Sequence, residues 1–143
     1  MEAEGPVLRP WIVLVDDDET LCALLSDLLV EAGYQVRCCG SSQAAEATIR
    51  RVRPDLVILD VWLESPQAGW RVLDALRRDP DLARVPVLIT SADSRCLSRG
   101  TGRLNGGRWA VLEKPFDLDQ LLAQVAGLIG RPEPERRLAG GDD

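Results

Sequence analysis

Three consecutive aspartates, Asp16, Asp17 and Asp18, directly follow the apolar run from Trp11 to Val15. Carboxylates this close repel one another and take up protons unless a cation compensates their charge. Magnesium prefers oxygen ligands, with a few supplied by the protein and the rest by water. We therefore interpret Asp16 and Asp17 as candidate magnesium ligands, whereas Asp18 and Glu19 are better placed to cap a following helix.

Three more residues that could do chemistry each stand at the end of an apolar run: Asp60, Thr90 and Lys114. Lys114 is the only lysine of the chain, and every other basic residue is an arginine. A compact ammonium can lie against a small anion as a point charge, which a planar guanidinium does less readily. Lys114 is therefore a candidate partner for an anion.

The elements that position these residues are short strand-like runs, most of them continuously apolar. Such runs are typical of parallel strands that are buried on both faces. They are Trp11–Val15, Gln35–Cys39, Leu56–Leu59, Val87–Thr90 and Trp109–Leu112.

Helical signals lie between these runs. Leucines recur at helical spacing from Leu21 to Leu29, and Gly33 stands where that helix would stop. Ser41 or Ser42 can cap a second helix through Ile49, and we expect a third helix from about Gly69 to Arg78. Asp117 can cap a last helix, with Gln120 placed for a capping box and an end near Gly130.

Strands that alternate with helices predict right-handed crossovers and a doubly wound parallel sheet. In such a sheet, ligands bind beyond the carboxyl ends of the strands, near the point where the winding direction reverses. The sequence therefore predicts that one edge brings together Asp16, Asp17, Asp60, Thr90 and Lys114.

Composition limits the classes of protein that fit. A chain of 143 residues suits one domain, which we place at residues 11–130, between an N-terminal extension (1–10) and a disordered tail (131–143). No apolar stretch is long enough to cross a bilayer, and the start lacks the pattern of a signal peptide, so we expect a cytoplasmic protein without membrane insertion.

The net charge of −6 argues against direct nucleic-acid binding. The 4 cysteines and 0 histidines show no zinc pattern, and we expect reduced thiols.

The ordered motifs VDDDET, PDLVILD, VPVLITS and EKPF resemble the receiver domain of two-component response regulators. The resemblance covers roughly Trp11 to Gly130. It implies a flavodoxin-like α/β fold, a five-stranded parallel sheet of order 2-1-3-4-5. It also implies that Asp60 is the phosphoacceptor and that Mg²⁺ is held by Asp16, Asp17, Asp60 and the backbone carbonyl of Trp62.

The resemblance further implies that Thr90 binds a phosphoryl oxygen and that Lys114 pairs with the phosphoryl charge. The phosphoryl donor would be a sensor histidine kinase or a phosphotransfer protein, and the output would pass to a downstream protein target. The chain would then be no enzyme in the ordinary sense, since it would act only in its own phosphotransfer and dephosphorylation.

Departures from the family pattern lie around the switch region. The usual aromatic residue three positions before the lysine is Val111, and Trp109 is the candidate substitute. The loop VWLESPQAGW lacks the usual proline four residues after Asp60 and is one residue longer. Four glycines between Gly100 and Gly107 predict an irregular or shortened fourth helix, because glycine in a helix interior costs about 1 kcal/mol relative to alanine.

Two other functions remain open from the sequence. The stretch from Asp16 also fits D-x-D-x-T, the nucleophile motif of haloacid dehalogenase-type phosphatases, with Asp16 as nucleophile and Asp18 as general acid. That family needs another pair of acidic residues after its lysine, whereas Lys114 is followed by the last helix and the tail. The other alternative is a receiver-like module that binds its partner without phosphorylation.

Overall fold

A five-stranded parallel sheet organises the chain in the computed structural model, which describes residues 9–92 and 108–132. Its order is β2-β1-β3-β4-β5, so the winding direction reverses between β1 and β3. The predicted fold class and strand order are confirmed. The strands are β1 (Trp11–Val15), β2 (Gln35–Cys39), β3 (Leu56–Asp60), β4 (Val87–Ser91) and β5 (Trp109–Glu113).

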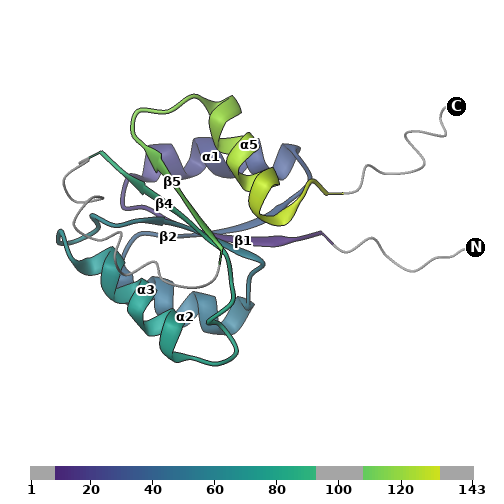
Figure 1. Cartoon of the computed structure of the whole chain (residues 1–143). Helices are drawn as coiled ribbons and strands as arrows, with labels where there is room; N and C mark the ends of the chain where they lie inside the picture. Colours follow the sequence, from purple (N-terminus) through teal and green to yellow (C-terminus); the bar gives the residue numbers. More distant parts are fainter. Residues whose placement is uncertain (1–8, 93–107, 133–143) are drawn as a thin grey trace, which may run out of the picture.

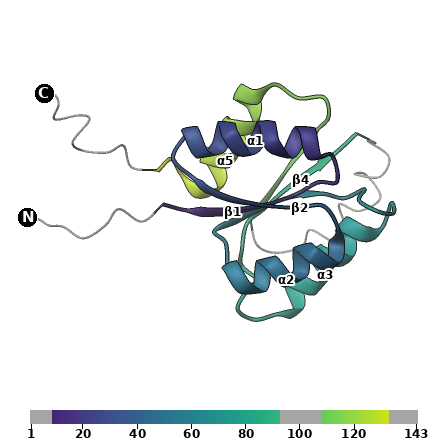
Figure 2. The ribbon, with the colours of Figure 1, turned by 180° about the vertical axis from the view of Figure 1, so that it is seen from behind.

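Two helical layers cover the sheet (Figures 1 and 2). On one face lie α1 (Glu19–Glu31) and α5 (Leu118–Ile129), and on the other lie α2 (Ser42–Val52) and α3 (Ala68–Arg78). The region in which we expect an irregular fourth helix, the residues before 9 and the tail from 133 lie outside the described residues. Within 9–92 and 108–132, no helix has the length and apolar character that a membrane crossing requires.

The sheet divides the apolar core into two clusters because side chains of a strand alternate between its faces. Val13 and Val57 pack on the side of α2 and α3, while Leu14 and Ile58 pack on the side of α1 and α5. Every residue of β3 and β4 is buried, which explains why these strands are continuously apolar up to their last residues. The predicted ranges of β3, β4 and β5 are each one residue too short.

Helices α1, α2 and α5 begin where the predicted caps stand. The Asp18 carboxylate accepts from the Leu21 amide at 3.0 Å, and the Ser41 hydroxyl accepts from the Ala44 amide at 3.1 Å. Before α5, the Gln120 side chain accepts from the Asp117 amide at 2.9 Å and completes a capping box. These caps fix the helix starts and thereby the short loops at the carboxyl edge of the sheet.

Candidate functional site

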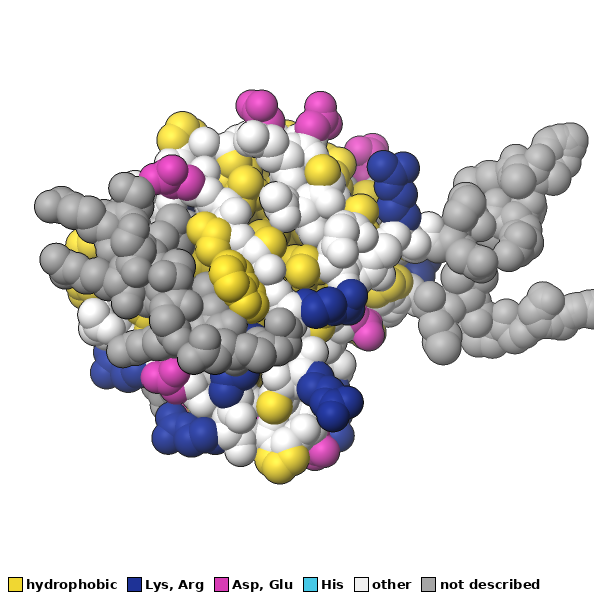
Figure 3. Space-filling model, in the orientation of Figure 1, with side chains coloured by type: hydrophobic (Ala, Val, Ile, Leu, Met, Phe, Trp, Pro, Cys, Tyr) yellow, Lys and Arg dark blue, Asp and Glu magenta, His cyan; other side chains and the backbone are white. Residues whose placement is uncertain are grey.

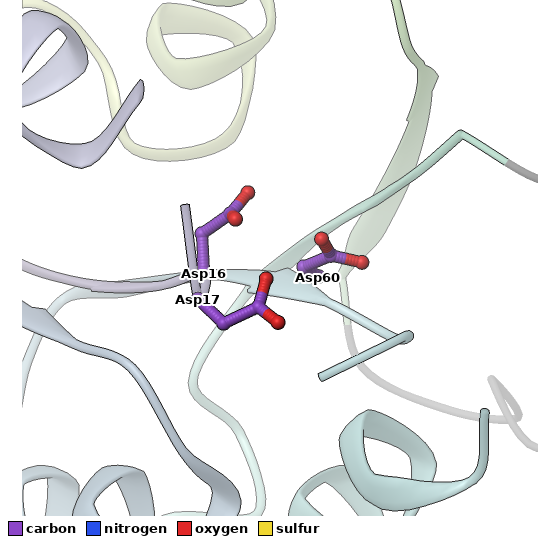
Figure 4. A group of neighbouring side chains, drawn as sticks. All are labelled: Asp16, Asp17 and Asp60. Atoms are coloured by element: carbon purple, nitrogen blue, oxygen red, sulfur yellow. The ribbon is translucent and has the colours of Figure 1, made fainter. Parts of the chain in front are cut away.

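Three carboxylates meet at the carboxyl edge of the two central strands. Asp16 and Asp17 follow β1, and Asp60 is the last residue of β3. An oxygen from each carboxylate lies within 4.8 Å of the others, and Figure 4 shows the three side chains together at the ends of these strands. Asp16 and Asp60 are buried, whereas Asp17 is exposed. Two of the three carboxylates are therefore enclosed by the protein, and the third is open to water.

Lys114 connects this cluster to the end of β5. Its Nζ donates to Asp16 Oδ2 at 2.6 Å and to Asp60 Oδ2 at 2.9 Å. Its backbone amide donates to the Ser91 carbonyl at 2.9 Å, which fixes the start of the side chain at the end of β4. The only lysine of the sequence thus reaches across β4 to Asp60 and across β4 and β3 to Asp16, and both of these carboxylates are buried.

Backbone amides orient the other oxygen of each buried carboxylate. Asp16 Oδ1 accepts from the Asp18 amide, and Asp60 Oδ1 accepts from the Trp62 amide, each at 2.9 Å. In both cases the donor lies two residues farther along the chain, as in an Asx-turn. The turn after each strand therefore holds its carboxylate in place.

Burial and charge act in opposite directions at this site. Burial raises the pKa of Asp60, and the hydrogen bonds from Lys114 and the Trp62 amide offset that rise only in part. For Lys114, burial opposes the charge, but the hydrogen bonds to Asp16 and Asp60 outweigh it and raise its pKa. One ammonium faces three carboxylates, so the site keeps an excess of negative charge.

The donor set fits a magnesium ion. It consists of carboxylate oxygens alone, and these are hard ligands that Mg²⁺ prefers to nitrogen or sulfur. Few protein ligands and one exposed carboxylate leave positions for water, which Mg²⁺ gives up reluctantly. The excess negative charge supplies the attraction.

Thr90 is the neighbour of Asp60 in the sheet. The two residues are paired in the register of β3 and β4, and Thr90 is buried. The Thr90 carbonyl accepts from the Val61 amide at 3.1 Å, so the residue that follows Asp60 is still hydrogen-bonded to β4. All five predicted site side chains therefore come from one edge of the sheet.

Val111 and its candidate substitute Trp109 lie at different positions along β5. Val111 pairs with Ile89, next to Thr90, whereas Trp109 pairs with Val87 at the amino end of β4. Trp109 is 41% exposed. Figure 3 shows hydrophobic side chains at the surface where β5 runs in Figure 1. Trp109 is therefore farther from Thr90 than Val111 is, by two residues along β5.

Sequence reasoning misses two contacts that shape the loop after Asp60. The Glu64 carboxylate accepts from the amide of Ser42 at 3.1 Å and also from its hydroxyl, which joins this loop to the start of α2. The Gly69 amide donates to the Val61 carbonyl at 3.0 Å, so α3 begins against the chain that leaves the site. A glycine in a helical pattern is the sequence signal that could have found the second contact.

Comparison with known sequences identifies relatives of this chain. The response regulator receiver domain family model matches residues 12–126. The DNA-binding dual master transcriptional regulator RpaA of Synechocystis is 34% identical over 124 residues, 87% of this chain and 51% of the relative. The phosphate regulon transcriptional regulatory protein PhoB of Rhizobium meliloti is 32% identical over 128 residues, 90% of this chain and 56% of the relative. The chain spans about half the length of these relatives.

Solved structures give the same assignment. A putative response regulator from Chloroflexus aurantiacus is 29% identical, with a TM-score of 0.75 over 87% of this chain and 100% of that chain. The chemotaxis protein CheY4 of Vibrio cholerae has a TM-score of 0.75 at 24% identity, covering 85% of this chain and 99% of that chain, and supports the fold alone. Because the family model covers most of the sequence, the chain belongs to the response regulator receiver domain family.

Proposed function

We propose that this chain is a phosphorylation-dependent signalling domain of a two-component system, in which Asp60 accepts a phosphoryl group. The observation that supports this proposal best is the environment of the Asp60 carboxylate. Its buried carboxylate contacts Lys114 and the Trp62 amide, and it lies within 4.8 Å of two further carboxylates. Receiver domains are phosphoacceptor signalling domains, and this arrangement matches that chemistry.

The proposed reaction is a transfer from a phosphohistidine. A carboxylate oxygen of Asp60 attacks the phosphorus, the bond from phosphorus to the imidazole nitrogen breaks, and an aspartyl phosphate forms. When bound to Asp16, Asp17, Asp60 and the Trp62 carbonyl, magnesium would compensate the negative charge of the carboxylates and the transferring group. Asp16 and Asp60 are already oriented by the turn amides, so few groups need to reorganise.

Lys114 and Thr90 have separate proposed roles. Lys114 Nζ lies 2.9 Å from Asp60 Oδ2 and is proposed to pair with the phosphoryl charge once the aspartyl phosphate has formed. Thr90 is the sheet neighbour of Asp60, and its hydroxyl is proposed to bind a phosphoryl oxygen. Such contacts favour one of two arrangements of the surface around β5, and this surface is proposed to carry the output.

The proposed partners are proteins. A sensor histidine kinase or phosphotransfer protein supplies the phosphoryl group, and a downstream protein reads the phosphorylated state. RpaA of Synechocystis is named as a DNA-binding regulator and is about twice as long as the matched segment. With a net charge of −6, the present chain is poorly suited to contact nucleic acid directly. We propose a cytoplasmic location, where such kinases present their phosphohistidine.

Phosphate-binding gel electrophoresis tests the proposal on the whole chain. The wild type, Asp60→Asn and Asp16→Asn are incubated with acetyl phosphate and magnesium, and the labelled residue is mapped by mass spectrometry. Label on Asp60 that disappears in Asp60→Asn supports the function. Label on Asp16 would favour the phosphatase alternative. A folded protein that takes no label from acetyl phosphate or from a histidine kinase would favour the module that binds without phosphorylation.

A further inference from the structure

Two cysteines outside the acidic site meet between α1 and β2. Cys22 is buried on α1, and Cys38 is exposed on β2, which is an edge strand of the sheet. Because side chains alternate along a strand, Cys38 lies on the α1 side, whereas the adjacent Cys39 belongs to the cluster on the side of α2 and α3. Only one of the two consecutive cysteines therefore faces Cys22.

The contacts of the pair are direct. Cys38 Sγ donates to the carbonyl oxygen of Cys22 at 3.8 Å, which places the Cys38 thiol against the backbone of Cys22. Cys22 Sγ in turn donates to the carbonyl oxygen of Asp16 at 3.2 Å. The pair is thus joined to the first residue of the acidic cluster by one hydrogen bond.

The exposed member has the character of a reactive thiol. The hydrogen bond with Cys22 lowers the pKa of Cys38 to about 7, although burial opposes the shift, and a hydrogen bond with Ser26 lowers it further. A substantial fraction of Cys38 is then thiolate near neutral pH, and the thiolate is the form that reacts with oxidants. Its place on an edge strand leaves it open to small molecules in water.

We infer that Cys22 and Cys38 are an oxidisable pair, a modification site at which a hydroperoxide forms an intramolecular disulfide between α1 and β2. The Cys38 thiolate attacks one peroxide oxygen and gives a sulfenic acid while the other oxygen leaves as hydroxide. The Cys22 sulfur then attacks the Cys38 sulfur, and the sulfenic oxygen leaves as water with the Cys22 proton. In sum, two thiols lose two electrons and two protons, and hydrogen peroxide is reduced to two waters.

The disulfide has a consequence for the acidic cluster, which rests on the magnesium site proposed above. Once oxidised, Cys22 has no S–H group and cannot donate to the Asp16 carbonyl. The Asp16 carboxylate also contacts Lys114, so the turn after β1 is coupled to the centre of the site. We expect the oxidised chain to bind magnesium more weakly than the reduced chain.

Peptide mapping after treatment with hydrogen peroxide tests the disulfide. In the wild type, peptides that contain Cys22 and Cys38 are expected to be linked without reductant and separate with it. Cys39→Ser is the matched control, because it changes the neighbouring cysteine on the opposite face and should keep the link. Cys96→Ser should keep it as well, whereas Cys38→Ser, at an exposed position, should lose it while its circular dichroism stays unchanged.

The mapping has outcomes that overturn the inference. A link that survives in Cys38→Ser, a link from Cys38 to Cys96, or a chain that carries only a Cys38 sulfenic or sulfinic acid would each rule out the pair as the site. Disulfide dimers through Cys38 without an internal link would do the same.

Magnesium titration separates the two parts of the inference. Reduced and oxidised wild type are titrated with magnesium chloride while tryptophan fluorescence is followed, and peroxide-treated Cys38→Ser is the control. Weaker affinity in the oxidised wild type alone supports the coupling. Equal affinities, with the link confirmed, would overturn the coupling and leave the disulfide. If the reduced chain binds no magnesium, the proposed function fails instead, since the mapping does not depend on it.

Discussion

A β-carbon at Gly69 would lie 2.5 Å from the carbonyl oxygen of Asp60. It would also lie 2.3 Å from the α-carbon of Val61, which is closer than real carbon atoms approach without displacement. The start of α3 thus packs against the backbone of the proposed phosphoacceptor. Glycine is needed here for space, because any side chain would push the end of β3 or the helix away.

Gly69→Ala should therefore destabilise the fold by about 1–3 kcal/mol, as overpacking does, and should slow phosphoryl uptake by moving Asp60. Denaturant unfolding and labelling with acetyl phosphate measure the two effects. Gly127→Ala in α5 is the matched control, because its β-carbon would meet no atom within 4 Å. That change should be neutral or stabilise by up to about 1 kcal/mol. Equal stability of the two variants would contradict the argument.

The positions of the strands, and the meeting of the polar residues at their ends, are predictable from sequence for the same physical reason. Continuous apolar runs mark strands buried on both faces, and polar residues at the ends of such parallel strands must share one edge. Trp11–Val15 follows directly from this pattern, and so does the meeting of Asp16 with Asp60. Asp18 is also predictable as a cap because its position relative to the apolar periodicity is local information.

Other features depend on contacts between distant segments and have no local signal. Nothing near Glu64 in the sequence indicates that it joins Ser42, since the bond requires the loop after β3 to lie beside the start of α2. The pairing of Cys38 rather than Cys39 with Cys22 depends on which face of β2 meets α1. The space restriction at Gly69 likewise appears only when α3 is docked.

Asp17→Ala should reduce the affinity for magnesium by more than about tenfold, because few protein ligands hold the ion. Asp17 is exposed, so its removal should leave the fold intact. Isothermal titration calorimetry with magnesium chloride measures the change. Asp18→Asn is the control, since it keeps a side-chain oxygen for the cap of α1 and stands one residue outside the cluster. A wild-type affinity in Asp17→Ala would remove this residue from the site.

The stability of the wild type relative to Asp60→Asn should rise as the pH falls in magnesium-free buffer. Burial raises the pKa of Asp60 above its ordinary 3.8, so the ionised carboxylate is less favourable in the folded chain than in the unfolded chain. This penalty is fully present above the folded pKa and disappears below the unfolded value. Thermal melts of both proteins at neutral pH and near the unfolded value measure the difference. A stability difference that is constant with pH would mean that folding does not raise the pKa of Asp60.

Lys114→Ala should still accept the phosphoryl group but fail to transmit it to the surface around β5. Loss of a charge-assisted hydrogen bond costs about 1.5–3 kcal/mol, which is enough to cancel a modest preference between two states. Hydrogen exchange of β4 and β5, before and after acetyl phosphate, measures the response. Lys114→Arg keeps the positive charge and should retain part of the response. If Lys114→Ala responded like the wild type, Lys114 would have no role in transmission.

The lifetime of the phosphorylated state should be long if Trp62 and Ala92 flank the approach of water to the phosphorus, as we propose. Hydrolysis requires a water molecule in line with the bond to Asp60, and the fraction of reactive geometries falls when access is screened. The Trp62 amide donates a hydrogen bond to Asp60, and Trp62 as a residue is 46% exposed rather than packed into the core. Ala92, two residues beyond Thr90, offers no polar group to orient water.

Trp62→Asn combined with Ala92→Glu should therefore shorten the phosphoryl half-life several-fold. The smaller residue opens the approach, and the introduced carboxylate can orient the attacking water. Loss of label is followed by phosphate-binding gels after the phosphoryl donor is removed. Trp109→Asn is the control, because Trp109 is also an exposed tryptophan but lies at the amino end of β5, and its half-life should match the wild type. A double variant that loses its phosphoryl group no faster than the wild type would show that these side chains do not control access to the phosphorus.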